Sequence, residues 1–179
     1  MKSTKDILTK LGACTEAVKW AGRKTHKKAW GTCQRGDWLL WIAGKLNVDR
    51  KLLVLAACGC ARTALKYIPV GEDRPRIAIE TAEAWTRGEA TIDQVRTAAH
   101  AAAAYADAAH AATAYAADAA HAAAAYAAAA YAVAAHAVAA CAAAAYAAVL
   151  AAARKDIADI VRKIIPFSVI CKAIADYEK

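Results

Sequence analysis

The sequence predicts an all-α protein in which a compact N-terminal helical bundle is followed by a long Ala-rich helix or helical hairpin. The first observation is the Ala-rich segment, residues 97–153, where 39 of 57 residues are Ala. Ala has the highest helix propensity, because it loses no side-chain entropy on folding. The second is that no Gly or Pro lies between Gly88 and Pro166 to interrupt a helix. The third is that no stretch alternates between polar and apolar residues as a strand would.

The N-terminal residues predict short helices. Residues 3–23 carry apolar side chains at helical spacing and are expected to form one or two helices, capped by Ser3 or Thr4. After a basic connection at residues 22–28, residues 29–34 are expected to add a short helical turn.

Two Asp residues mark the expected starts of the next helices. Asp37 is expected to cap an almost wholly apolar helix that begins with residues 38–42. Asp49 is expected to start a longer helix that runs to about Ile68, where Pro69 stops it because proline lacks a backbone N–H.

Similar signals lead into the Ala-rich segment. Asp73 is expected to cap a helix that has Pro75 in its first turn and ends near Gly88. Thr91-x-x-Gln94 is a capping-box pattern, in which each side chain bonds the other's backbone N–H, and it is expected to start the Ala helix.

Composition divides the chain into three regions. Residues 1–90 hold all five Trp and are expected to form the compact region, and residues 91–165 form the long Ala-rich helical region. The end of that region, residues 156–165, is amphipathic. Residues 166–179 are expected to form a short C-terminal helix, over residues 168–178, that packs back on the rest.

His, Asp and Tyr interrupt the Ala run at regular spacing. On one continuous helix the His and Asp residues share one face and the Tyr residues lie on another. The first face holds His100, Asp107, His110, Asp118, His121 and His136, and the second holds Tyr105, Tyr115 and Tyr126. Because an Ala-rich surface buries little area alone but lets helices approach closely, we expect a homo-oligomer through residues 97–153.

The Asp107-x-x-His110 and Asp118-x-x-His121 pairs have a spacing that a helical metal site can use. One helix supplies only one side of a coordination shell, so surface pairs are the favoured interpretation. We expect no metal and no other cofactor.

The formal net charge of +8 and the pI near 9.2 favour an acidic partner, which can be a nucleotide, an acidic protein surface or, less favoured, nucleic acid. Lys and Arg are densest in residues 19–28 and 154–163. The six Cys form no C-x-x-C pair, and the N-terminus has no apolar signal region. We therefore expect a cytoplasmic protein, and the Asp and His residues of the Ala run argue against a membrane span.

Common enzyme motifs are missing: the sequence has no G-x-S-x-G, no P-loop, no H-E-x-x-H and no G-x-G-x-x-G. Glu80 and Glu83 could act as paired carboxylates, but surface ion pairs explain them equally well. We expect a protein without catalytic activity.

Several motifs resemble a known family. R-G-D-W-L-L-W at residues 35–41, V-L-A-A-C at 54–58, G-E-D-R-P-R-I-A-I-E at 71–80 and D-I-V-R-K-I-I-P at 159–166 are similar to segments of small Ala-rich helical immunity proteins found in bacterial and phage genomes. This resemblance implies neutralisation by binding, directed at a toxin or, in a phage, at a host defence component.

One set of charged and aromatic residues could converge on a ligand. Arg side chains bind phosphate through paired donors, helix N-termini favour anions, and aromatic faces stack on bases. The set comprises Arg35, Asp37, Trp38, Arg62, Tyr67, Glu72, Asp73, Arg74, Arg76, Glu80 and Trp85. The alternative is a buried network of Arg and carboxylate side chains that locks helices together.

We therefore expect a non-catalytic binding protein of immunity or phage anti-defence type that sequesters an anionic, nucleotide-like signal molecule. The first alternative is a protein–protein inhibitor that covers a toxin or defence effector. The second is an enzyme that degrades a nucleotide signal.

Overall fold

The computed structural model describes residues 3–68, 70–109 and 147–179, and within these ranges all regular structure is helical, as the sequence predicts. The helices are α1 (Thr4–Lys10), α2 (Thr15–Ala21), α3 (His26–Thr32), α4 (Gly36–Lys45), α5 (Arg50–Arg62), the 3₁₀ helix η1 (Leu65–Tyr67), α6 (Arg74–Arg87), α7 (Ile92–Ala109), α10 (Ala147–Ile164) and α11 (Phe167–Tyr177).

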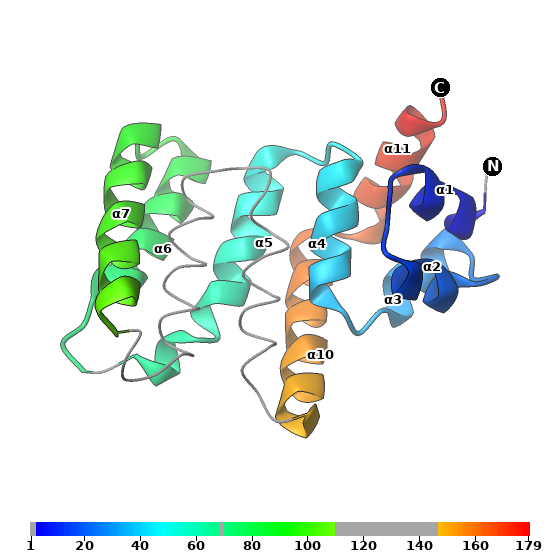
Figure 1. Ribbon diagram of the computed structural model, residues 1–179. Helices are drawn as coiled ribbons and strands as arrows, with labels where there is room; N and C mark the ends of the chain where they lie inside the picture. The colour runs from blue at the N-terminus through cyan, green and yellow to red at the C-terminus, as the bar shows by residue number, and fades with distance from the viewer. Residues whose placement is uncertain (1–2, 69, 110–146) are drawn as a thin grey trace.

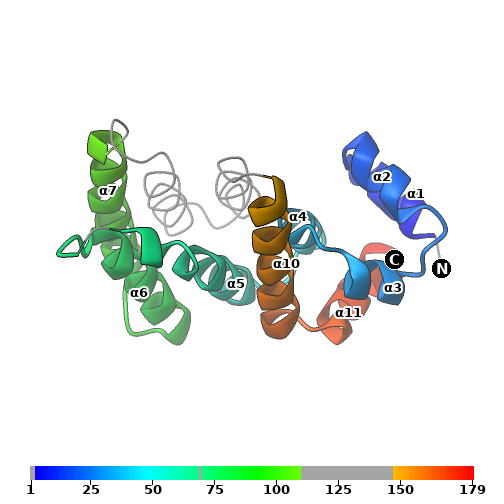
Figure 2. The same ribbon diagram turned by 90° about the horizontal axis from the view of Figure 1, so that it is seen from below.

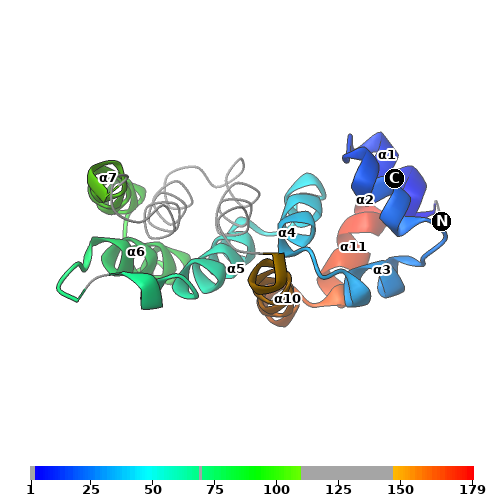
Figure 3. The same ribbon diagram turned by 60° about the horizontal axis from the view of Figure 1, so that its bottom comes forward.

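The described helices form an elongated row. Figure 1 shows α7 and α6 at one end, then α5, then α4 with α10, and finally α11, α3 and the α1–α2 pair together with both chain termini. Figures 2 and 3 show the same order from other sides, with α5 between α6 and α4 in each view. Segments from the two ends of the sequence therefore share one end of the molecule.

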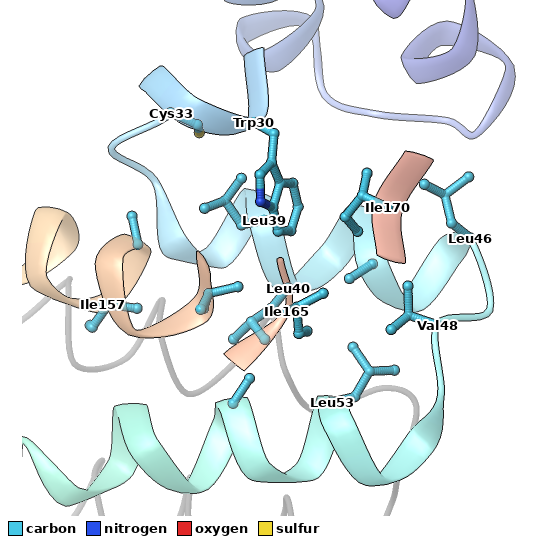
Figure 4. Close-up of a cluster of buried hydrophobic side chains, with 14 of the residues drawn as sticks. Trp30, Cys33, Leu39, Leu40, Leu46, Val48, Leu53, Ile157, Ile165 and Ile170 are labelled. Carbon is cyan, nitrogen blue, oxygen red and sulfur yellow. The ribbon is translucent and has the colours of Figure 1, made fainter. Parts of the chain in front are cut away.

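The larger of the two hydrophobic cores among the described residues extends from α5 toward this shared end. Apolar side chains of α3, α4, α5, α10 and α11 meet there, and Figure 4 shows them converging between the helices. Helix α10 contributes Ile157, Ala158 and Val161, and Ile165 directly follows it; all four are at most 2% exposed and follow helical spacing on one face. A second core joins α5, α6 and α7, and it includes Val54, Ile79 and Val95.

Two glycines let α10 approach its neighbours closely. A Cβ at Gly36, the first residue of α4, would lie 2.9 Å from the backbone nitrogen of Ala158 and closer still to Ile157. A Cβ at Gly59 of α5 would lie 2.8 Å from Cγ2 of Ile160. Real Cβ atoms do not pack at such distances, so both positions depend on glycine for the docking of α10.

Local capping signals are confirmed at three helix starts. Ser3 forms a capping box with Asp6 at the start of α1. Oδ1 of Asp49 accepts from the backbone N–H of Lys51 at 2.8 Å at the start of α5. Thr91 and Gln94 bond each other's backbone N–H at 2.7 and 3.2 Å, as the capping-box pattern predicts, and α7 follows.

Four local expectations are wrong in detail. The connection expected at residues 22–28 already contains the first residues of α3, which begins after the N-cap Thr25. Asp37 is not an N-cap, because α4 starts at Gly36 and the Asp37 carboxylate binds an Arg side chain instead. Helix α5 ends at Arg62 rather than near Ile68.

Asp73 is the fourth case: it occupies the N-cap position of α6 but makes no side-chain cap bond, because its carboxylate pairs with Arg76. Most of residues 97–153 lie outside the described part of the chain. Three expectations for this segment therefore stay predictions: that it forms one helix or a hairpin, that it has a His/Asp face and a Tyr face, and that it mediates a homo-oligomer.

Candidate functional site

The structure divides the eleven candidate residues between two places. Arg35, Asp37 and Trp38 lie at the start of α4. The other described members lie on α5, on α6 or just before it: Arg62, Glu72, Asp73, Arg74, Arg76, Glu80 and Trp85. Because α5 stands between α4 and the body of α6, the two groups do not converge on one site (Figure 1). The side chain of Tyr67 lies outside the described part of the structure.

The α6 group consists largely of ion pairs on the protein surface. Arg62 pairs with Glu83 through two hydrogen bonds of 2.8 and 2.7 Å, which link α5 to α6. Arg76 pairs with Asp73 at 2.9 Å and with Glu80 at 3.1 Å. These two Arg side chains are 41% and 45% exposed, so the pairs are not a buried network.

Two further members of the α6 group also have partners. Nε of Arg74 donates to Glu72 at 2.7 Å, and that pairing lowers the pKa of Glu72. Trp85 packs beside the second core. The Arg side chains at this helix start are thus already paired with neighbouring carboxylates.

The α4 group is built differently. Nε of Arg35 donates to Oδ1 of Asp37 at 2.8 Å, and Nη2 donates to Oδ2 at 2.5 Å. These hydrogen bonds raise the pKa of Arg35, so its guanidinium stays cationic. The same guanidinium lies over the ring of Trp38, 4.6 Å from the ring centroid, and Trp20 meets Trp38 edge to face at 5.9 Å.

These residues border a cavity of about 500 Å³, which we call the basic aromatic cavity. Its walls come from α2, α3, α4, α10 and the connections around α3. The lining residues are Glu16, Trp20, Lys24, Thr32, Cys33, Gln34, Arg35, Trp38 and Arg154. A volume of this size lies within the usual range for small-molecule sites.

Three cations and one carboxylate line the basic aromatic cavity. Nζ of Lys24 bonds the carbonyl oxygen of Trp20 and lies 4.3 Å from the centroid of that ring. Glu16 approaches Nη1 of Arg35 at 3.6 Å but is 73% exposed, so water weakens its effect. The three cations outnumber the carboxylates by one when Asp37, the partner of Arg35, is counted together with Glu16.

Arg154 is the least satisfied of these cations. Its Nε is buried and has no hydrogen-bond partner among the residues that the structure describes. Buried donors are normally hydrogen-bonded, and because Arg154 also lines the cavity its guanidinium is a candidate anchor for an anionic group there.

Helix α10 positions Arg154 by binding the end of α3. Nη1 of Arg162 donates to the carbonyl oxygens of Cys33 at 2.6 Å and Trp30 at 3.2 Å, and Nη2 donates to Asp159 at 2.6 Å. This contact satisfies carbonyl groups that α3 leaves open at its C-terminal end. It also fixes α10 beside the cavity.

Sequence reasoning missed Glu16, Trp20, Lys24 and Arg154 as site residues. The available signal was the pair of basic clusters, residues 19–28 and 154–163, because Lys24 comes from the first and Arg154 from the second. The sequence alone does not indicate that these two clusters, which are far apart along the chain, meet in the fold.

No metal centre is found among the described residues, where no three His, Cys, Asp or Glu side chains gather closely enough to bind an ion. The two Asp-x-x-His pairs of the Ala run lie outside the residues whose side chains the structure describes. None of the helices in the described ranges has the length and apolar composition needed to cross a membrane.

Comparison with known proteins identifies the family. Residues 46–165 match the family described as Imm-5 like putative immunity protein, which is more than half of the chain. The chain belongs to this family. The matched range includes the segments at residues 54–58 and 71–80, whereas R-G-D-W-L-L-W at 35–41 precedes it. No curated protein and no solved structure matches the chain.

Family membership gives the chain an immunity-type role and confirms the resemblance predicted from the sequence. The family match contains Arg154, but the other lining residues of the basic aromatic cavity, from Glu16 to Trp38, precede the match. The cavity thus combines one helix of the family region with the N-terminal residues of this chain.

Proposed function

We propose that this immunity-type protein neutralises its target by holding an anionic, nucleotide-like molecule in the basic aromatic cavity, in the cytoplasm and without converting it. The observation that carries the proposal is the meeting of Arg35, Arg154 and the Trp20–Trp38 pair in one cavity. Such a protein would act as an immunity protein or, in a phage, as an anti-defence protein.

The chemistry of the lining residues suits a phosphate joined to a flat ring. Arg binds phosphate oxygens through charge-assisted hydrogen bonds, and the buried Nε of Arg154 would gain a partner. Asp37 holds Arg35 against Trp38, so this guanidinium is already oriented before a ligand arrives. Exposed aromatic faces can stack on a base.

Binding without turnover fits the same lining. Cys33 is the nucleophilic thiol among the described lining residues, and burial raises the pKa of that thiol. A thiol with a raised pKa is protonated near neutral pH and is a weak nucleophile. Glu16 is the one lining carboxylate among these residues, and it is mostly exposed.

A titration with ADP tests this proposal. We expect Arg154→Gln to weaken ADP binding about tenfold to a hundredfold, because one charge-assisted contact contributes about 1.5–3 kcal/mol. Arg76→Gln is the matched control at the α6 surface and should bind ADP as the wild type does. Isothermal titration calorimetry measures both, beside melting curves that establish folding.

The titration also has outcomes that count against the proposal. If the wild type does not bind ADP, the nucleotide-like ligand class is wrong. If Arg76→Gln loses binding and Arg154→Gln keeps it, the anion site lies at the start of α6 instead.

A second candidate function is inhibition of a toxin or defence effector by covering its surface. It is favoured by three large apolar side chains that are exposed on the α6 and α7 side of the molecule. They are Val70, Ile77 and Ile92, at 107%, 46% and 39% exposure. Exposed apolar side chains beside ion pairs are common where proteins bind one another, so a protein partner would contact this end.

A further inference from the structure

A second cavity lies beside the basic aromatic cavity, between the α1–α2 pair and helices α3, α4 and α11. It encloses about 340 Å³, and its walls are mostly apolar. Four of the five Trp line it: Trp20, Trp30, Trp38 and Trp41. We call it the apolar cavity.

The two cavities adjoin. Trp20, Cys33 and Trp38 line both of them. The edge-to-face contact between Trp20 and Trp38, with ring centroids 5.9 Å apart, therefore stands at their border. A single ligand that reaches past this pair would have its charged part among Arg side chains and its other part among aromatic rings.

Trp30 brings a polar group to the wall of the apolar cavity. Trp30 is 5% exposed, and its indole Nε1 has no hydrogen-bond partner among the residues that the structure describes. Figure 4 shows this nitrogen on the side of the ring that faces Leu39, and both residues line the cavity. Buried indole N–H groups usually find an acceptor, so a ligand atom could supply one here.

The Asp37, Thr4 and His26 side chains of the apolar cavity already have partners. Asp37 accepts three hydrogen bonds from Arg35. Oγ1 of Thr4 donates to the carbonyl oxygen of Lys24 at 2.7 Å and lies 2.9 Å from Nδ1 of His26. Trp30 Nε1 is thus a buried donor without a partner among the described residues, in a wall that is mostly apolar, and a few polar groups in an apolar wall are typical of a site for a flat ring with an acceptor atom.

We propose that the apolar cavity receives the aromatic heterocycle of the ligand whose phosphate binds in the basic aromatic cavity, with Trp30 Nε1 donating to an acceptor atom of the ring. This inference rests on the proposed function and deepens it, because it assigns the ring and the phosphate of the ligand to two adjoining cavities. A sugar phosphate without a heteroaromatic ring would use only the basic aromatic cavity and bind more weakly.

Two probes and two variants test the inference. ADP carries both parts of the expected ligand, and ribose 5-phosphate lacks the base. Ala29→Leu places extra volume in the apolar cavity, because Ala29 is a buried lining residue. Trp30→Phe keeps an aromatic ring and removes the N–H donor. Ala101→Leu on the exposed face of α7 is the matched control for added volume.

We expect Ala29→Leu to weaken ADP binding at least tenfold and Trp30→Phe to weaken it about twofold to tenfold, the effect of one hydrogen bond. Both variants should bind ribose 5-phosphate within twofold of the wild type, and Ala101→Leu should change neither affinity. If Ala29→Leu does not fold, the affinities of Trp30→Phe for ADP and for ribose 5-phosphate still test the inference.

Two outcomes overturn the inference in distinguishable ways. If Trp30→Phe and a folded Ala29→Leu bind ADP as the wild type does while Arg154→Gln does not, the ring lies elsewhere and the proposed function stands. If the wild type binds neither probe, the proposed function fails and this inference fails with it.

Discussion

At the scale of single residues, burial separates the cysteines into two chemical classes. Burial raises the pKa of Cys58 to about 12, whereas Cys14 and Cys171 are exposed. At pH 8 a thiol with pKa 12 is ionised in about one molecule in ten thousand, and an ordinary thiol with pKa near 8.5 in roughly one in four. Because the thiolate is the reactive form, Cys58 should be unreactive well above neutral pH.

Alkylation tests this difference. We expect iodoacetamide at pH 8 to modify Cys14 and Cys171 of the native protein and to leave Cys58 intact, whereas in urea Cys58 should also react. Peptide mass spectrometry measures each site. Equal rates at Cys58 and Cys14 in the native protein would contradict the buried position of Cys58.

The candidate site could be predicted from the sequence only in part at this scale. Arg35, Asp37 and Trp38 were selected for their chemistry and for the nearby helix start, and they do line the two cavities. The same reasoning also selected Arg74 and Arg76, which pair with nearby carboxylates as Arg35 does but do not line either cavity described above. Side-chain type and sequence position alone therefore select more residues than the fold brings to a cavity.

At the scale of secondary-structure elements, the docking of α10 depends on a glycine at the start of α4. Gly36→Ala would place a Cβ against Ile157 and the backbone of Ala158, so we expect it to lower the free energy of unfolding by about 2 kcal/mol or more. Gly44→Ala is the matched control in the same helix, because a Cβ there meets no atom within 4 Å.

Urea unfolding compares the two glycine variants. Gly44→Ala should raise the free energy of unfolding by about 0.5–1 kcal/mol, since Ala loses less backbone entropy in a helix than Gly does. Equal stability of the two variants would mean that α10 does not approach α4 as closely as described.

Helix boundaries were predictable where a local sequence signal marks them. The capping boxes of Ser3 and Thr91 were predictable because both partners lie three residues apart in the sequence. The end of α5 was not, because no Gly or Pro marks it. There, Oγ1 of Thr63 bonds the carbonyl oxygen of Cys60 at 2.7 Å, and a 3₁₀ turn follows. Asp37 was misassigned because Arg35 competes for its carboxylate.

At the scale of the whole molecule, the all-α class follows from composition, but the arrangement of the helices does not. Arg162 binds the carbonyl oxygen of Trp30, 132 residues earlier in the chain, and Arg154 lines a cavity with Lys24. Helical periodicity indicates which face of α10 is apolar but not which helices that face contacts. For this reason the site could be recognised only after α10 was placed beside α3 and α4.

The central claim is that the protein neutralises by holding an intact small anion, and mass spectrometry of the small molecules that co-purify with it tests this claim most directly. The protein would be purified from bacteria with an active nucleotide-based defence system, beside Arg154→Gln, and heated to release what it carries. We predict a phosphate-bearing molecule with a heteroaromatic ring, recovered unchanged from the wild type and missing from Arg154→Gln. A stoichiometric protein partner with no bound small molecule would contradict the claim and favour the inhibitor of a toxin or effector.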